Sequence, residues 1–281
     1  MRKIKAIHKA RYTPIADLVT YNALPTHSLP QIDPFLFLNH HGPQVYKPNN
    51  NGLPFGPHPH RGMETVTFII EGDIMHQDSA GNESVIEAGG VQWMTAGRGL
   101  IHAEVSSTKF KKEGGPLEIL QLWINLPAKH KMTTPQYVGL QKDKIPTASL
   151  ADGVEAQVIA GSWPQTKPAF DTISDVTLST LHLKQGSSLS LQVAAERNIF
   201  FYMIRGEVKV NEIKAEMLHL VEFTHDGDSI TIEAIADTII LFGHALPFNE
   251  PLVAHGPFVM NTMEEIQQAY ADYQAGKFGN H

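Results

Sequence analysis

The chain has 281 residues, no cysteine and a formal charge of −7 with histidine neutral, from 22 basic and 29 acidic side chains. The absence of cysteine excludes disulfide scaffolds, thiol catalysis, iron–sulfur clusters and cysteine-ligated zinc. Hydrophobic residues make up 42% of the chain, enough for one or two domains with substantial cores. The acidic balance argues against direct nucleic-acid binding, and no apolar run approaches the roughly 18 residues of a membrane span. We therefore expect a cytoplasmic protein that does not bind membranes.

The first half of the chain has the pattern of an all-β fold, with short β-branched and aromatic runs separated by Gly, Asn, Asp and Pro. Residues 64–70 predict a strand, and residues 74–76 predict its hairpin partner across Gly72. Residues 84–86 predict the next strand. Residues 117–126 predict a strand with one face largely buried, which Pro127 ends.

A second copy of the pattern follows. Residues 199–210 repeat the order of an apolar run, a charged residue, Gly, an acidic residue and another apolar run, and Gly206 lies 134 residues after Gly72 (206 − 72). A repeat of this length predicts a duplicated β domain. Because residues 133–168 are rich in Pro and Gly, we expect two domains, at residues 1–133 and 134–281. The second should carry a terminal amphipathic helix behind a Thr262-to-Glu265 capping box.

Two short pairs of side chains suggest a metal site. His58 and His60 are two residues apart, as are His102 and Glu104, so each pair lies on one face of a strand. A single His-x-His is more often structural in a chain with 15 histidines, but two facing pairs would bring four ligands to one point. Three imidazoles and a carboxylate suit Fe(II), Mn(II), Ni(II), Cu(II) or Zn(II), and six-coordination leaves two positions open.

Several longer blocks resemble a known family. Gly52, His58, His60 and Glu64 resemble the first cupin motif, and Gly99-x2-His102 resembles the core of the second. Closer matches are to the pirin family, in the blocks Asp33–Leu38, His58–Thr67, Gln92–Gly99, Leu122–Leu126 and His255–Thr262. The resemblance implies an all-β bicupin, in which two antiparallel jelly-roll barrels are stacked, here followed by the short C-terminal helix.

The resemblance also implies a cofactor and a ligand set. Pirins hold one mononuclear divalent metal in the N-terminal barrel, with iron as the first choice and Mn, Ni, Cu or Zn as alternatives. The family's ligands fall on His58, His60, His102 and Glu104, the four residues that strand parity selects. Glu64, the usual cupin carboxylate, is then expected to orient the ligands or to be structural. Arg61, Phe68, Trp93 and Met94 are further candidates for the surroundings of the site.

The C-terminal barrel is expected to be free of metal. Adding 134 to His58 and His60 gives Gln192 and Ala194, neither of which matches the histidines. His244 could be a remnant of the second motif, but a hydrogen-bonded structural histidine is the simpler interpretation.

Two functions remain open from the sequence. Resemblance to quercetin 2,3-dioxygenases within the family implies O2-dependent cleavage of a flavonol ring with release of CO, with Glu104 accepting the 3-hydroxyl proton. The alternative is a redox-sensitive regulator, in which the metal modulates binding to a transcription factor or metabolic enzyme. A charged loop at residues 109–113 would favour that protein partner.

Overall fold

The computed structural model describes residues 1–163 and 165–279, which divide into two compact units. The first, here called the histidine unit, comprises Tyr12–Asn22, Phe35–Asp143 and Phe248–His281. The other, called the second unit, comprises Met1–Arg11, Ala23–Pro34 and Lys144–Pro247. Each unit therefore consists of segments that are distant in sequence.

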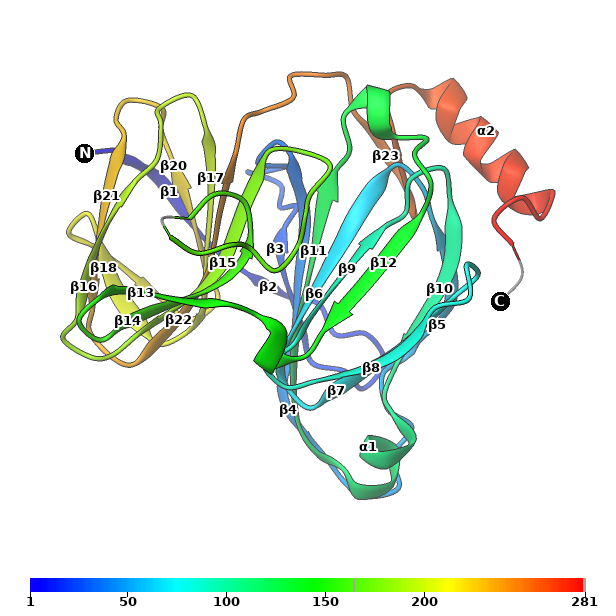
Figure 1. Cartoon of the computed structure of the whole chain (residues 1–281), viewed down its shortest axis with the longest axis horizontal. Helices are drawn as coiled ribbons and strands as arrows, with labels where there is room; N and C mark the ends of the chain where they lie inside the picture. Colours follow the sequence, from blue (N-terminus) through cyan, green and yellow to red (C-terminus); the bar gives the residue numbers. More distant parts are fainter. Residues whose placement is uncertain (164, 280–281) are drawn as a thin grey trace. The chain divides into compact units, whose positions relative to one another are not determined.

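The histidine unit is built on two antiparallel sheets (Figure 1). The seven-stranded sheet has the order β12-β9-β6-β11-β4-β3-β2, and the four-stranded sheet has the order β5-β10-β7-β8. The strands are β2 (Arg11–Tyr12), β3 (Thr20–Leu24), β4 (Phe35–Tyr46), β5 (Phe55–His60), β6 (Met63–Glu71), β7 (Asp73–Asp78), β8 (Glu83–Glu87), β9 (Val91–Thr95), β10 (Leu100–Val105), β11 (Gly115–Asn125) and β12 (Gln136–Leu140). A small hairpin of β23 (Val253–His255) and β24 (Phe258–Met260) completes its strands.

The second unit repeats this topology. Its seven-stranded sheet has the order β1-β20-β17-β22-β15-β14-β13, and its four-stranded sheet has the order β16-β21-β18-β19, so β13 to β22 take the places of β2 to β11. The strands are β1 (Ile4–Lys9), β13 (Thr147–Ala151), β14 (Val154–Ala160), β15 (Val176–Leu183), β16 (Ser188–Gln192), β17 (Asn198–Arg205), β18 (Glu207–Val210), β19 (Ile213–Glu216), β20 (His219–Phe223), β21 (Ser229–Ala234) and β22 (Thr238–Ala245). The predicted duplication is thus confirmed, and so are the all-β class and the short C-terminal helix.

The two ends of the chain differ from the expected division into residues 1–133 and 134–281. Strand β1 pairs with β20 and so fills in the second unit the edge position that β12 fills in the histidine unit. Helix α2 (Met263–Gln274) packs instead on β23 and β24 of the histidine unit. Sequence periodicity could not show either arrangement, because pairing between distant segments depends on long-range contacts.

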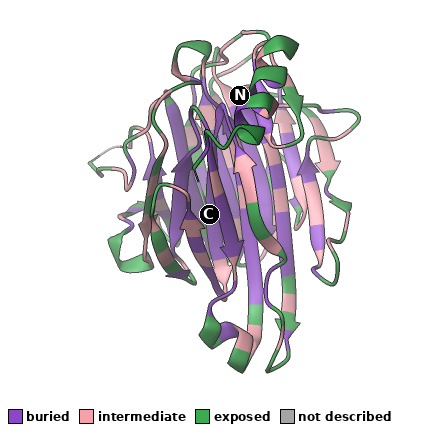
Figure 2. Cartoon of the chain, turned by 90° about the vertical axis from the view of Figure 1, so that its right-hand side faces the viewer, coloured by how far each residue is buried: buried purple, intermediate pink, exposed green. Residues whose placement is uncertain are grey.

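Burial follows the hydrophobic patterning. Strands β6 and β17 are almost entirely buried, and β17 reads accordingly as a near-continuous apolar run, whereas β6 also buries Glu64, Thr65 and Thr67. In Figure 2 the buried residues concentrate in the strands, and the exposed ones in loops and on the helical turns. Among the described residues, no helix is both long and apolar enough to cross a membrane.

The helices begin at side-chain caps. In α2, Thr262 Oγ1 accepts from the amide of Glu265, whose carboxylate returns to the amide of Thr262, so the predicted capping box is present. Residues 109–113, expected as a charged loop, belong instead to helix α1 (Thr108–Glu113). Ser107 Oγ caps this helix by accepting from the amide of Phe110, whose side chain is buried.

A buried arginine fastens β1 within the second unit. Arg2 is 1% exposed, and its guanidinium donates to the carbonyl oxygens of Gly227 at 2.8 Å, Arg197 at 2.8 Å, Ala194 at 2.8 Å and Val193 at 3.4 Å. Because these carbonyl groups lie close to the buried guanidinium, removing the donor leaves acceptors unsatisfied.

We therefore predict that Arg2→Ala lowers the free energy of unfolding by about 3 kcal/mol, measured by urea denaturation. Lys3→Ala is the matched control, since the Lys3 side chain is 79% exposed. We expect that control to change stability by less than about 0.5 kcal/mol. Equal effects of the two substitutions would contradict the role assigned to Arg2.

Candidate metal centre

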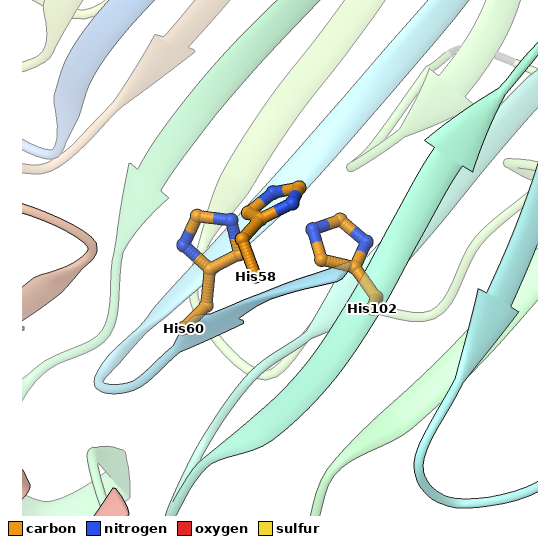
Figure 3. Close-up of side chains that lie close together, drawn as sticks. All are labelled: His58, His60 and His102. Carbon is orange, nitrogen blue, oxygen red and sulfur yellow. The ribbon is translucent and has the colours of Figure 1, made fainter. Parts of the chain in front are cut away.

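Three histidines meet on one face of the four-stranded sheet. Strands β5 and β10 are adjacent and antiparallel, with His58 directly opposite His102 and His60 opposite Leu100. Opposed residues of antiparallel strands share a face, so His60, two residues from His58, joins the same group. Ligand atoms of the three imidazoles lie within 4.8 Å of one another, and the rings point toward a common centre (Figure 3). The strands are thus neighbours in one sheet, whereas the sequence predicted strands that face each other.

Two of the rings are oriented by backbone carbonyl groups. His58 Nδ1 lies 2.7 Å from the carbonyl oxygen of Gly56, and His60 Nδ1 lies 3.2 Å from that of Pro257. A carbonyl oxygen only accepts, so each Nδ1 carries the proton and each Nε2 presents a lone pair. His60 Nε2 is buried and has no hydrogen-bond partner among the residues described. A buried acceptor of this kind is what a metal ion would satisfy.

Electrostatics also favour the neutral ligand form of His60. Burial, followed by the proximity of His58, lowers the pKa of His60 from 6.5 to about 3. The ring is therefore unprotonated near pH 7, as metal coordination requires. The donor set of the cluster fits a divalent transition metal of borderline softness.

Glu104 lies beside the cluster but is held by other groups. Its carboxylate accepts hydrogen bonds from Thr67 Oγ1 at 3.1 Å, from the amide Nε2 of Gln92 and from the amide Nε2 of Gln121. It is not among the side chains whose ligand atoms lie within 4.8 Å of one another. Three hydrogen-bond donors fix the position of this carboxylate, so Glu104 is preorganised as an acceptor at the edge of the histidine cluster.

A cavity of about 240 Å³ opens onto this cluster. Its walls are partly aromatic, since the rings of Phe37 and Trp123 are stacked with their centroids 4.5 Å apart. The Trp123 indole also donates to Gln121 Oε1, which links the wall to the glutamine that holds Glu104. The lining residues are Phe37, Asn39, His41, Phe55, His58, His60, Glu104, Gln121, Trp123, Gly256 and Pro257.

The turn that follows His60 is fixed from several sides. Gly62 has φ +81°, and a Cβ there would collide with the carbonyl oxygen of Val259. Lys131, 1% exposed, donates through Nζ to the carbonyl oxygens of Gly62 and Val259, both at 2.9 Å. These contacts tie the end of β5 to β24, and so hold the segment that carries the histidines.

The other predicted site residues lie outside the cavity lining. Arg61 donates to Asp272 of α2 at 2.9 Å and stacks on Phe278, so it anchors the C-terminal helix. Glu64 accepts from Thr95 Oγ1 at 2.7 Å, and burial raises its pKa. Glu64 lies three residues from Thr67 on β6, and therefore on the opposite face of that strand from the Glu104 contact.

Strand parity explains the positions of Phe68 and Trp93 as well. Phe68 shares the Glu64 face, and Trp93 pairs with Val66 on that face. Met94 packs with Ala96, Leu100 and Tyr137. Residues chosen because they are close to the histidines in sequence are therefore not the residues that line the cavity. Alternation along residues 117–126, which puts Gln121 and Trp123 on one face, was the available signal.

Comparisons with known proteins agree with this architecture. The family model "Pirin" matches residues 17–124, and "Pirin C-terminal cupin domain" matches residues 178–279. A Pseudomonas aeruginosa protein named "Putative quercetin 2,3-dioxygenase" is 36% identical over 266 residues, 94% of this chain and 92% of the relative. A "Pirin-like protein" of Caulobacter vibrioides is 36% identical over 248 residues, 88% and 87% of the two chains.

Solved structures give the same result. The crystal structure of a quercetin 2,3-dioxygenase from Acinetobacter baumannii superimposes with a TM-score of 0.94 at 35% identity, covering 100% of this chain and 99% of that one. Both halves of the sequence match pirin domains, and relatives above 30% identity extend over nearly its whole length. The chain therefore belongs to the pirin family.

Proposed function

We propose that this protein is a metal-dependent dioxygenase that uses O2 to cleave the heterocyclic ring of a quercetin-type flavonol with release of CO. The observation that carries the proposal is the cluster of His58, His60 and His102 at the end of an aromatic-walled cavity. The names of the Pseudomonas and Acinetobacter relatives support the choice of reaction.

The proposed ligands are the three histidines together with Glu104. A metal held there would supply a Lewis acid for the flavonol 3-oxygen and a redox-active centre for reaction with O2. Iron is our first choice, because an oxygenase needs a metal that changes its oxidation state readily, although the donor set also accepts Mn, Ni, Cu or Zn.

The protein residues would position the substrate and accept its proton. The stacked rings of Phe37 and Trp123 offer a flat apolar surface for a planar aromatic substrate. Glu104, held in position by Thr67, Gln92 and Gln121, would take the proton of the 3-hydroxyl group through one of its oxygens. The partly enclosed cavity limits water around the activated ring.

The regulatory alternative has no comparable observation in its favour. The segment proposed for contacts with a protein partner, residues 109–113, forms helix α1 and buries Phe110 in the core of the histidine unit. We therefore propose the enzymatic function alone.

The first test replaces one proposed ligand. His102→Ala should reduce quercetin turnover at least about 100-fold and lower the iron content. Loss of a group that orients a metal ligand costs roughly 10- to 100-fold in activity, and loss of the ligand itself should cost more. Turnover is measured as O2-dependent loss of quercetin absorbance together with CO release, using Fe(II)-reconstituted protein.

His27→Ala provides a matched control, since His27 is exposed and lies in the second unit. The control should retain full turnover, and both variants should keep the wild-type circular dichroism spectrum. Full activity of folded His102→Ala would rule out the proposed centre.

The second test concerns the orientation of Glu104. Gln121→Leu removes one donor to the carboxylate and the acceptor of the Trp123 indole. We expect kcat to fall about 10- to 100-fold, the usual effect of losing a group that orients a metal-site residue.

Gln77→Leu is the matched control, because Gln77 Nε2 makes an exposed hydrogen bond to Glu83. Its kcat should equal that of the wild type. An unchanged kcat in Gln121→Leu would show that the Gln121 contact does not support catalysis.

A further inference from the structure

The second unit contains a cavity at the position equivalent to the candidate metal centre. It measures about 270 Å³, close to the 240 Å³ of the cavity at the histidines. Residues of β15, β16 and β22 line it, and these strands are the topological counterparts of β4, β5 and β11, which line the first. Duplication has therefore preserved a hollow between the same strands.

The chemistry of this second cavity is different. Strands β16 and β21, the counterparts of the strands that carry the three histidines, contain no histidine. Gln192, which the 134-residue offset pairs with His58, does lie on β16 and lines the cavity. Much of the remaining lining is apolar, with Leu150, Leu189, Leu191, Val193 and Phe242.

Two of the residues that line this cavity carry side-chain N–H groups. The indole Nε1 of Trp163 is buried and has no hydrogen-bond partner within residues 1–163 and 165–279. His244, on β22, lines the same cavity and accepts at Nδ1 from Arg197 Nε at 2.7 Å. Because Nδ1 accepts, the proton of the neutral ring is on Nε2, which makes this N–H the second donor.

His244 is a neutral hydrogen-bond donor near pH 7. Burial, followed by the positive charge of Arg197, lowers the pKa of His244 to about 4, so the ring is neutral near pH 7. Arg197 is itself held by Asp175 at 2.6 Å. His244 lies on the counterpart of β11, whereas His102 lies on β10, so it is not a remnant of the second cupin motif.

We propose that the cavity of the second unit binds a small aromatic carboxylate. The apolar walls would enclose the ring, and the two carboxylate oxygens would accept from the indole N–H of Trp163 and the imidazole N–H of His244. An unpartnered buried donor is costly, and an acceptor oxygen supplied by a ligand would relieve that cost. This site is separate from the proposed catalytic centre and does not depend on its activity.

The test uses 2-naphthoate as a probe and the full-length, ¹⁵N-labelled protein. The chain has three tryptophans, Trp93, Trp123 and Trp163, so the indole N–H region of the spectrum holds three resonances. The Trp163→Phe variant identifies the resonance of Trp163. Titration with 2-naphthoate should move that resonance downfield in a saturable manner and leave the other two in place.

Calorimetry on the variants then tests the contacts. Trp163→Phe should weaken 2-naphthoate binding about tenfold, because the ring is kept and one hydrogen bond is lost. Leu191→Phe, which narrows the cavity, should weaken it at least as much. Leu246→Phe is the matched control, since Leu246 is 42% exposed and outside the lining, and should bind normally.

His102→Ala should also bind 2-naphthoate normally, which distinguishes this site from the metal centre. The proposal fails if millimolar 2-naphthoate leaves the Trp163 resonance unmoved, or shifts only those of Trp93 or Trp123. It also fails if Trp163→Phe binds as tightly as the wild type, an outcome that remains decisive even where Leu191→Phe does not fold.

Discussion

The antiparallel pairing of β5 with β10 is the constraint on which the candidate centre depends. In this register His58 lies opposite His102, and the two-residue period of a strand then adds His60 to the same face. A slip of one residue would turn every one of these side chains to the other face. Gly62, Lys131 and β24 make contacts around the turn after β5. These contacts therefore help to hold the register of β5 against β10 as well as to stabilise the fold.

Hydrogen bonds from neighbouring groups hold the residues of the candidate centre in position. Backbone carbonyl groups of Gly56 and Pro257 fix the tautomers of His58 and His60, and amide side chains fix the carboxylate of Glu104. Pro257 lies in the hairpin that α2 covers, so the C-terminal segment contributes directly to the surroundings of the site. Helix α2, at the far end of the sequence, packs on this hairpin and so belongs to the histidine unit.

Each of the two duplicated units contains a cavity, but different side chains line the two cavities. Corresponding strands line cavities of similar volume, but one contains a histidine cluster and the other contains leucines, a tryptophan and a single histidine. The backbone arrangement fixes the size and position of each cavity, because it follows from strand order and sheet packing. A few side chains on β5, β10 and β16 determine whether that cavity suits a metal or an organic molecule.

Local patterns in the sequence determined much of the fold. Alternation and turn residues predicted the all-β class, the duplication and the capping box of the terminal helix. The hairpins predicted at Gly72 and Gly206 are wrong, because β6 and β7, like β17 and β18, lie in different sheets and pair with other strands. At each of these glycines the chain crosses from one sheet to the other. Strand parity alone grouped the three histidines. It also placed Glu104 beside them, although the structure shows its carboxylate held by Gln92 and Gln121.

Other features were decided only by the tertiary structure. Arg61 and Glu64 are close to the histidines in sequence, but Arg61 binds Asp272 of α2 and Glu64 binds Thr95 on the opposite face of β6. Strands β4 and β11 supply much of the cavity lining instead. The placement of β1 in the second unit and of α2 in the histidine unit likewise depends on pairing between the two ends of the chain and distant strands. Such pairings depend on which surfaces meet after folding, and no local periodicity encodes that choice.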